Sequence, residues 1–117
     1  MRKIVKISGH EYSLKSSAWT QFKYKNDTGR SLIADLTNLS KSNEDDIVNN
    51  VDGLLEMLLR ISYNMIIEAD EKQAGSYEDF LKSLEESLFD ENEWISEVLQ
   101  VAVSPISRGI QTTSPQE

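Results

Sequence analysis

The stretch VDGLLEMLLRISYNMII, residues 51–67, places the tightest limit on what this chain can fold into. Its polar residues recur every four positions and share one narrow stripe: Asp52, Glu56, Arg60, Asn64 and, one turn further, Glu68. The apolar arc of a surface helix is normally about 100° wide or slightly wider, and the apolar arc of this helix is much wider. It is therefore either the centre of the fold, with Leu58 among the most buried residues, or it offers a second apolar face to a partner.

A second pattern, KIVKISGHEYSLK at residues 3–15, alternates apolar and polar residues on both sides of Gly9 and predicts a β-hairpin. A two-residue loop at Gly9 and His10 suits a type II′ turn. The expected cross-strand pairs are Val5 with Leu14 and Ile7 with Tyr12, and all four side chains share one face. Because two strands alone are barely stable in water, this face has to pack on the helices.

Two short helices are expected after the hairpin. The first begins at the serines 16–17, carries Trp19 and Phe22 on its inward side, and ends at Gly29, a residue suited to a left-handed cap. Tyr24 is out of phase with those two aromatic residues and is a candidate for a surface contact. The second helix has its apolar stripe at Leu32, Ile33, Leu36 and Leu39.

Three further helices are expected, each preceded by a polar capping residue. The first runs from Ser42 to about Asp70, the second begins at Ser76, and the third begins at Asp90 and either stops at Pro105 or adds a short turn through Arg108. Their inward stripes are Phe80, Leu81, Leu84 and Leu88 in the second, and Trp94, Ile95, Val98, Leu99 and Ala102 in the third.

These elements predict a mainly α fold, a compact bundle of about five helices with an N-terminal β-hairpin packed on it. Residues 1–111 are expected to form a single domain, with the hairpin at 3–15. The tail at 112–117 contains no apolar residue and is expected to be disordered.

Charge is distributed unevenly along the chain, whose net charge is −8. Residues 1–42 hold eight basic and three acidic side chains, which sum to +5, whereas residues 43–97 hold three basic and sixteen acidic ones, which sum to −13. An acidic body repels nucleic acid, so no nucleic-acid partner is expected. The acidic segment indicates a solvated helical surface, attraction to a basic partner, or mimicry of nucleic-acid charge.

The side chains that carry most enzyme chemistry are nearly missing from the sequence. There is no cysteine, and the one histidine, His10, falls in the predicted hairpin loop. A calcium-binding EF-hand loop needs Gly at its sixth position and Glu at its twelfth, but Gly53 and Gly75 put Leu59 and Leu81 there. No glycine-rich loop opens a helix. We therefore expect no enzyme, no cofactor and no metal site.

No segment indicates a membrane or a secreted protein. The start, MRKIVKISGHEY, is basic but lacks the apolar run of a signal peptide, and the apolar region at 54–67 is too short and too charged to span a bilayer. A cytoplasmic location is expected.

The order of these parts resembles the tail assembly chaperones of long-tailed phages and prophages of Gram-positive bacteria, over roughly residues 4–100. The hairpin carries the pattern I-x-G-x-x-Y-x-L at Ile7, Gly9, Tyr12 and Leu14. The stretch FKYKNDTGRSLIADL carries the second part of the resemblance at Tyr24, Lys25, Gly29, Asp35 and Leu36. Ser8 departs from the family pattern, in which Asn often precedes the turn glycine.

The resemblance implies a non-enzymatic role in the host bacterial cytoplasm. Such proteins bind the tape measure protein, a long helical chain, and keep it soluble while tail tube protein polymerises around it. The partners implied are therefore the tape measure protein and the tail tube protein, and self-association stays open. Because aromatic anchors dominate interfaces, we expect Phe89, Trp94 and Leu99 on the C-terminal helices to contact the partner.

Two other functions are compatible with the sequence. A virion tail structural or connector protein would also lack catalytic residues. A small acidic inhibitor that mimics nucleic-acid charge would need its carboxylates on one continuous face. The carboxylates here are interleaved with apolar stripes and helix caps, which favours ordinary helix surface.

Overall fold

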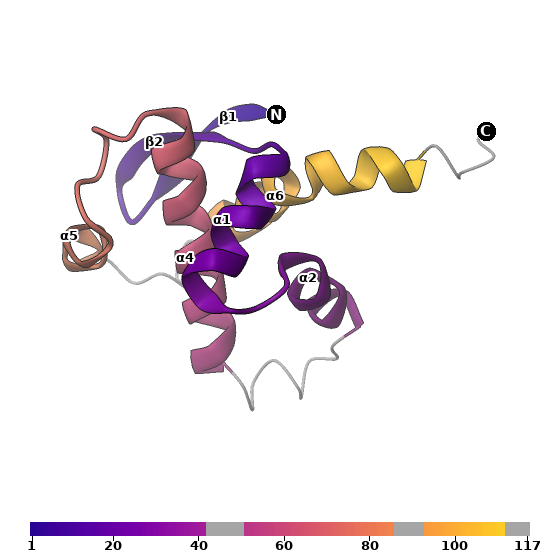
Figure 1. Ribbon diagram of the computed structural model, residues 1–117. Coiled ribbons are helices and arrows are strands. Elements are labelled where there is room, and N and C mark those ends of the chain that lie inside the picture. Colours follow the sequence, from indigo (N-terminus) through magenta and orange to yellow (C-terminus); the bar gives the residue numbers. More distant parts are fainter. Residues whose placement is uncertain (42–50, 86–92, 112–117) are drawn as a thin grey trace.

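The computed structural model describes residues 1–41, 51–85 and 93–111. In them the chain forms an antiparallel hairpin followed by five helices, which is the predicted architecture (Figure 1). The elements are β1 (Arg2–Ile7), β2 (His10–Lys15), α1 (Ala18–Thr28), α2 (Leu32–Lys41), α4 (Val51–Ala69), α5 (Tyr77–Ser83) and α6 (Glu93–Gln111). The predicted helix starts at Ser42 and Asp90, and the predicted disordered tail at 112–117, lie outside the described residues.

The hairpin turns at a different place from the one predicted. Val5 pairs with Tyr12 and Ile7 with His10, so the loop is Ser8–Gly9 and the expected pairs of Val5 with Leu14 and Ile7 with Tyr12 are wrong. Ser8 and Gly9 have φ values of 51° and 84°, which is the pair of positive values that a type I′ turn requires. The prediction of the buried face is nevertheless correct. The predicted and observed registers differ by two residues, and such a shift keeps every side chain on its own side of the sheet.

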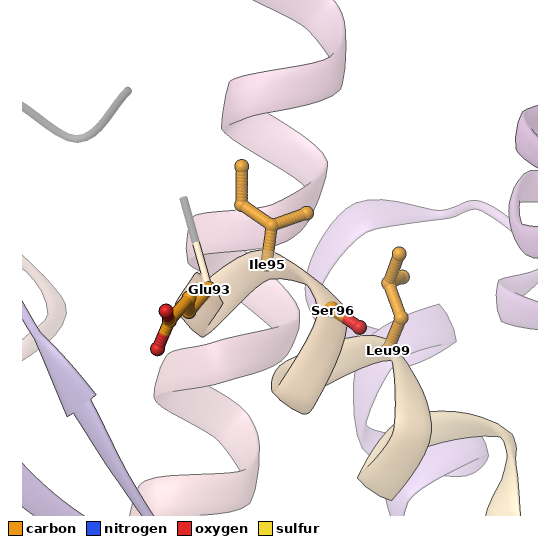
Figure 2. Close-up of a pocket in the computed structure, with 4 residues that line it drawn as sticks. All are labelled: Glu93, Ile95, Ser96 and Leu99. Atoms are coloured by element: carbon orange, nitrogen blue, oxygen red, sulfur yellow. The ribbon is translucent and has the colours of Figure 1, made fainter. Parts of the chain in front are cut away.

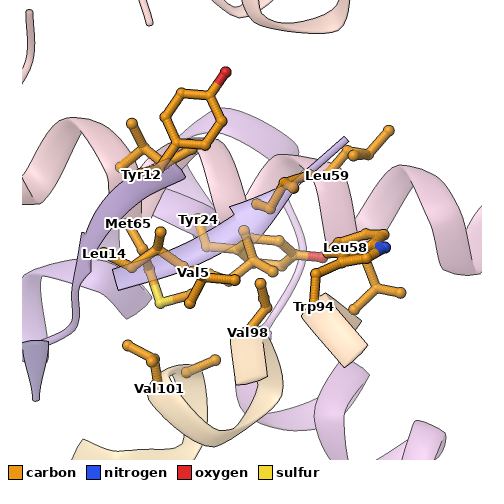
Figure 3. Packing of buried hydrophobic residues seen from close by; sticks show 14 of the residues in the cluster. Val5, Tyr12, Leu14, Tyr24, Leu58, Leu59, Met65, Trp94, Val98 and Val101 are labelled. Carbon is orange, nitrogen blue, oxygen red and sulfur yellow. The ribbon is translucent and has the colours of Figure 1, made fainter. Parts of the chain in front are cut away.

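One apolar core joins the hairpin to the helices (Figure 3). The four hairpin residues expected on the inner face are all buried, as predicted, on a surface formed by α4 and α6: Val5, Ile7, Tyr12 and Leu14. The buried side chains that surround them come mainly from these two helices: Leu58, Leu59, Ile61, Met65, Ile66, Trp94, Val98, Val101 and Ala102. The hairpin is therefore one wall of the core.

Helix α4 is the central helix of the fold. Leu58 is 0% exposed, as expected, and residues on opposite sides of the helix are buried as well, for example Leu59 and Ile61, which are two residues apart. In Figure 1, α4 runs through the middle of the molecule, with α1 beside it, α5 at its other side and the hairpin behind. The broad apolar arc of this helix is thus used inside the chain between residues 58 and 66.

The cap predicted for α5 is present. Ser76 is the N-cap, its hydroxyl accepts from the Asp79 backbone N–H, and the Asp79 carboxylate accepts from the Ser76 N–H in return. Phe80 is the buried anchor of this helix and packs in a ring cluster with Tyr12, Tyr63 and Tyr77. Leu81, expected on the inward stripe, is exposed instead.

Helix α6 does not stop at Pro105, and it also extends past the short turn predicted through Arg108. It continues through Pro105 to Gln111. Figure 1 shows its C-terminal part extending away from the other elements. Proline inside a helix removes one backbone hydrogen bond, which a helix end standing clear of the core tolerates better than a packed segment does.

Candidate functional site

Helix α1 is attached to α4 through polar side chains. The Glu68 carboxylate accepts hydrogen bonds from the hydroxyls of Ser17 at 2.6 Å and Thr20 at 2.5 Å. Two turns along α4, the Arg60 guanidinium lies 3.0 Å from the Asp27 carboxylate. Between Arg60 and Glu68 the polar stripe of α4 therefore faces α1.

Asn64 lies between Arg60 and Glu68 on this same stripe. Its side chain is fully buried, and neither its amide nitrogen nor its oxygen finds a hydrogen-bond partner among the described residues. Burial alone would raise the pKa of Asp27, but the ion pairs with Arg60 and Lys23 together outweigh it, and the pKa is lowered.

The orientation of α1 is opposite to the one predicted. Thr20 and Tyr24 are its buried residues, each 1% exposed, whereas Trp19 is 46% and Phe22 is 76% exposed. The prediction that Trp19 and Phe22 face inward is wrong. The prediction that Tyr24 lies at the surface is wrong as well. The physical reason is that the side of α4 available to α1 is polar, so the polar side of α1 packs on it.

We name the solvent side of this helix the outward face of α1. It consists of the exposed residues Ala18, Trp19, Phe22, Lys25 and Asn26. Trp19 and Phe22 are three residues apart and so are neighbours on the helix surface. Two large aromatic side chains exposed side by side contribute little to the core of their own chain, and this makes the face the leading candidate for a binding site.

The corner between α1 and α2 holds the outward face in place. Tyr24 donates from its hydroxyl to Asp35 Oδ2 at 2.7 Å, and Arg30 donates to both oxygens of that carboxylate, at 2.9 and 2.7 Å. Gly29, with a φ of 74°, is the left-handed C-cap of α1, as predicted. The residues of the second resemblance motif are therefore mostly structural.

These contacts shift two ionisation equilibria. The hydrogen bonds from Arg30 lower the pKa of Asp35, against the opposing effect of its burial, and the bond from Tyr24 lowers it further. Burial raises the pKa of the Tyr24 phenol well above its ordinary value, and the neighbouring carboxylate raises it more. At neutral pH the corner thus holds a carboxylate, a guanidinium and a neutral phenol.

The three residues predicted to contact a partner fall in different places. Trp94 is 2% exposed and belongs to the core, so in this conformation it is not available to a partner. Leu99 is half-buried and lines a shallow hollow on α6 together with Glu93, Ile95 and Ser96. Figure 2 shows Ile95 and Leu99 on the same side of the helix. Phe89 lies outside the described residues.

Few other features of the described chain suggest chemistry. His10 is exposed beside the turn, with its ring 6.2 Å from that of Tyr12. Across residues 1–41, 51–85 and 93–111, no three acidic or histidine side chains are grouped so that they could hold a metal ion. In the same ranges no helix combines the length and the apolar character needed to cross a membrane.

Comparisons of the chain with protein-family models, with curated proteins and with solved structures find no match. The resemblance to tail assembly chaperones therefore depends on the sequence motifs alone.

Proposed function

We propose that this protein is a phage tail assembly chaperone. In the cytoplasm of the host bacterium it binds the tape measure protein and keeps that long helical chain soluble while the tail tube assembles. The binding is not catalytic, and the tail tube protein is a second candidate partner.

The observation that carries the proposal is the reversed orientation of α1, which exposes Trp19 and Phe22. A long helical client exposes apolar stripes before it is assembled, and a helix docked on another protein is held by side chains spaced three and four residues apart. Trp19 and Phe22 have this spacing, and aromatic side chains are the commonest anchors of protein interfaces. The outward face of α1 thus takes over the role first assigned to Phe89, Trp94 and Leu99.

The acidic composition supports solubility more than it supports mimicry of nucleic acid. Asp27, Asp35 and Glu68 are used in contacts within the fold, so these three carboxylates do not belong to a free acidic face. Exposed carboxylates such as Glu56 and Glu78 remain on the surface. High net charge of one sign disfavours aggregation, a useful property in a protein that holds an aggregation-prone client.

Co-expression tests the proposal. We expect the tape measure protein to be largely insoluble alone, and to be soluble and to copurify when the wild-type chain is present. The double variant Trp19→Ala/Phe22→Ala should lose this effect. The matched control is Ile4→Ala/Leu81→Ala, which removes two exposed apolar side chains elsewhere and should behave as wild type.

If the wild-type chain leaves the solubility of the client unchanged and nothing copurifies, the chaperone proposal fails. A tail structural or connector protein then becomes the leading function. If both double variants behave as wild type, the client is bound but not through α1.

A further inference from the structure

We propose that the outward face of α1 recognises an acidic amphipathic helix, that is, a partner segment whose apolar stripe is flanked by Asp and Glu. This inference deepens the proposed function, on which the identity of the partner depends. It assigns the chemistry of the bound segment, and it gives α1 a charge preference opposite to the one expected for the acidic body of the chain.

The apolar part of the site is small and well defined. Phe22 is the most exposed large hydrophobic residue of the described chain, and Trp19 lies one helical turn before it. Neighbours three residues apart on a helix are separated by roughly 5–6 Å at Cβ, about the spacing of successive side chains on one stripe of a docked helix. The two rings can therefore pack against a single apolar stripe.

The charges around these rings are mostly positive. Residues 15–30, which include α1 and both of its ends, contain four basic residues and one acidic residue, a sum of +3 in a chain whose net charge is −8. Lys25 is exposed and three residues from Phe22, and Lys15 is exposed just before the helix. Lys23, four residues from Trp19, is partly exposed.

The nearby carboxylates are already engaged. Asp27 is 10% exposed and is held by Arg60 and Lys23. Glu68 reaches the first turn of α1 from α4, but its two oxygens accept from Ser17 and Thr20. Asp35 is buried against Arg30. Because Lys23 and Arg30 take part in two of these pairs, the basic side chains left to meet the carboxylates of a partner are Lys15 and Lys25.

Other anionic partners fit this surface less well. Nucleic acids and anionic membranes are attracted by clusters of several basic side chains, and a net charge of −8 repels both over the whole molecule. The outward face offers two aromatic rings and a few separate lysines, which is enough to orient one helix.

Binding of designed peptides tests the charge preference directly. Two helical peptides of equal length share one leucine stripe, and their flanking positions carry Glu in one and Lys in the other. The fluorescence of Trp19 reports binding in a Trp94→Phe background, which removes the buried indole. We expect the acidic peptide to bind about tenfold more tightly at low salt, and the difference to shrink as salt screens the exposed charges.

Charge reversal provides the matched control. Lys15→Glu/Lys25→Glu should abolish or invert the preference while leaving the aromatic pair intact. Lys72→Glu/Lys82→Glu changes the net charge by the same amount at exposed positions in the loop after α4 and on α5, and it should leave the preference nearly unchanged. Trp19→Phe/Phe22→Ala, followed by peptide anisotropy, should weaken binding of the acidic peptide.

Several results would overturn the inference. Equal or tighter binding of the basic peptide, or equal effects of the two charge-reversed variants, would remove its electrostatic basis. A larger Trp19 response to anionic vesicles or to a single-stranded oligonucleotide would assign the face to a different partner. Self-association that is lost in Trp19→Ala/Phe22→Ala would assign the face to a second copy of this chain.

The two proposals fail in different ways. If the wild-type chain holds the tape measure protein in solution but shows no preference between the peptides, only the charge assignment is wrong. If the acidic peptide binds and the tape measure protein does not, the site is real and the proposed client is wrong.

Discussion

Asp35 is the residue that ties α1 to α2, because three donor groups from Tyr24 and Arg30 converge on its carboxylate. Only about 7% of this side chain is exposed, whereas Arg30 is largely in solvent. A carboxylate with a lowered pKa stabilises the folded state at a pH above its pKa in the unfolded chain. This contribution is lost when the pH falls through the lower pKa of the folded state.

The first prediction follows from that sign. Asp35→Asn should lower the melting temperature at pH 7. The difference in melting temperature between wild type and variant should become smaller as the pH falls from about 5 to about 3. Thermal melts of both proteins over this range provide the measurement. Asp27 also loses its stabilising contribution in acid, but it does so in both proteins, so this effect cancels in the difference between their melting temperatures. A difference in melting temperature that stays constant with pH would mean that the pKa of Asp35 is not lowered in the folded state.

Asn64 presents the opposite situation, a buried amide without a partner among the described residues. Leaving a buried polar group unpaired costs about 1–3 kcal/mol, so Asn64→Leu, of similar volume, should raise the free energy of unfolding by about 1 kcal/mol. Asn64→Asp, which has the same shape but can ionise, should lower it at pH 7. Chemical denaturation measures both. A clear loss of stability in Asn64→Leu would show that the amide makes a stabilising contact.

At the scale of elements, the outward aromatic face of α1 is expected to contribute little to the stability of its own chain, because Trp19 and Phe22 are exposed. Trp19→Ala and Phe22→Ala should each change the free energy of unfolding by no more than about 0.5 kcal/mol. Tyr24→Ala on the buried side should cost about 3 kcal/mol or more. Thermal melts compare the three variants. A large loss from Phe22→Ala would place that ring in the core.

The hairpin turn allows another prediction at this scale. Ser8 has a positive φ of 51°, a conformation that costs most L-residues about 1–2 kcal/mol and that Asn adopts more easily. Ser8→Asn should therefore raise stability by up to about 1 kcal/mol, and the β-branched variant Ser8→Val should lower it. Denaturant midpoints measure the change. Equal midpoints for Asn and Val would be incompatible with a type I′ turn.

Much of this architecture can be predicted from the sequence, and the failures have definite causes. Strand alternation and the caps at Ser17, Ser76 and Gly29 are local properties, so they predict the elements correctly. The hairpin face does not determine the register, because a shift by two residues preserves it. The orientation of α1 depends on the polar stripe of another helix, a tertiary effect that hydrophobic spacing cannot reveal.

The candidate site was missed for the same reason. Ser17, Thr20, Tyr24 and Asp27 are themselves spaced three and four residues apart, and this is a second helical face that competes with the one containing Trp19 and Phe22. The signal available in the sequence was that the polar residues on this second face match the polar stripe of α4, which indicates that the two helices pack through these residues.

At the scale of the whole molecule, the buried apolar side chains are concentrated where the hairpin, α4 and α6 meet. Leu58→Ala should lower the free energy of unfolding by about 2–5 kcal/mol, because the side chain is fully buried and its removal leaves a cavity. Leu81→Ala, the same substitution at an exposed position, should change it little. Thermal melts test the pair. Similar effects at both positions would mean that α4 is not the centre of the core.

The contact between β1 and α6 also determines when this fold can be completed during translation. Lys3 reaches Gln100 at 3.0 Å and Glu97 at 3.4 Å, so elements almost a whole chain length apart cover each other. A ribosome adds about 5–20 residues per second, and the intervening stretch therefore takes roughly 5–20 seconds to synthesise. Throughout that time the apolar face of the hairpin lacks one of the two helices that bury it. A nascent chain stalled before α6 should remain open to proteases, although all the other elements have already been made.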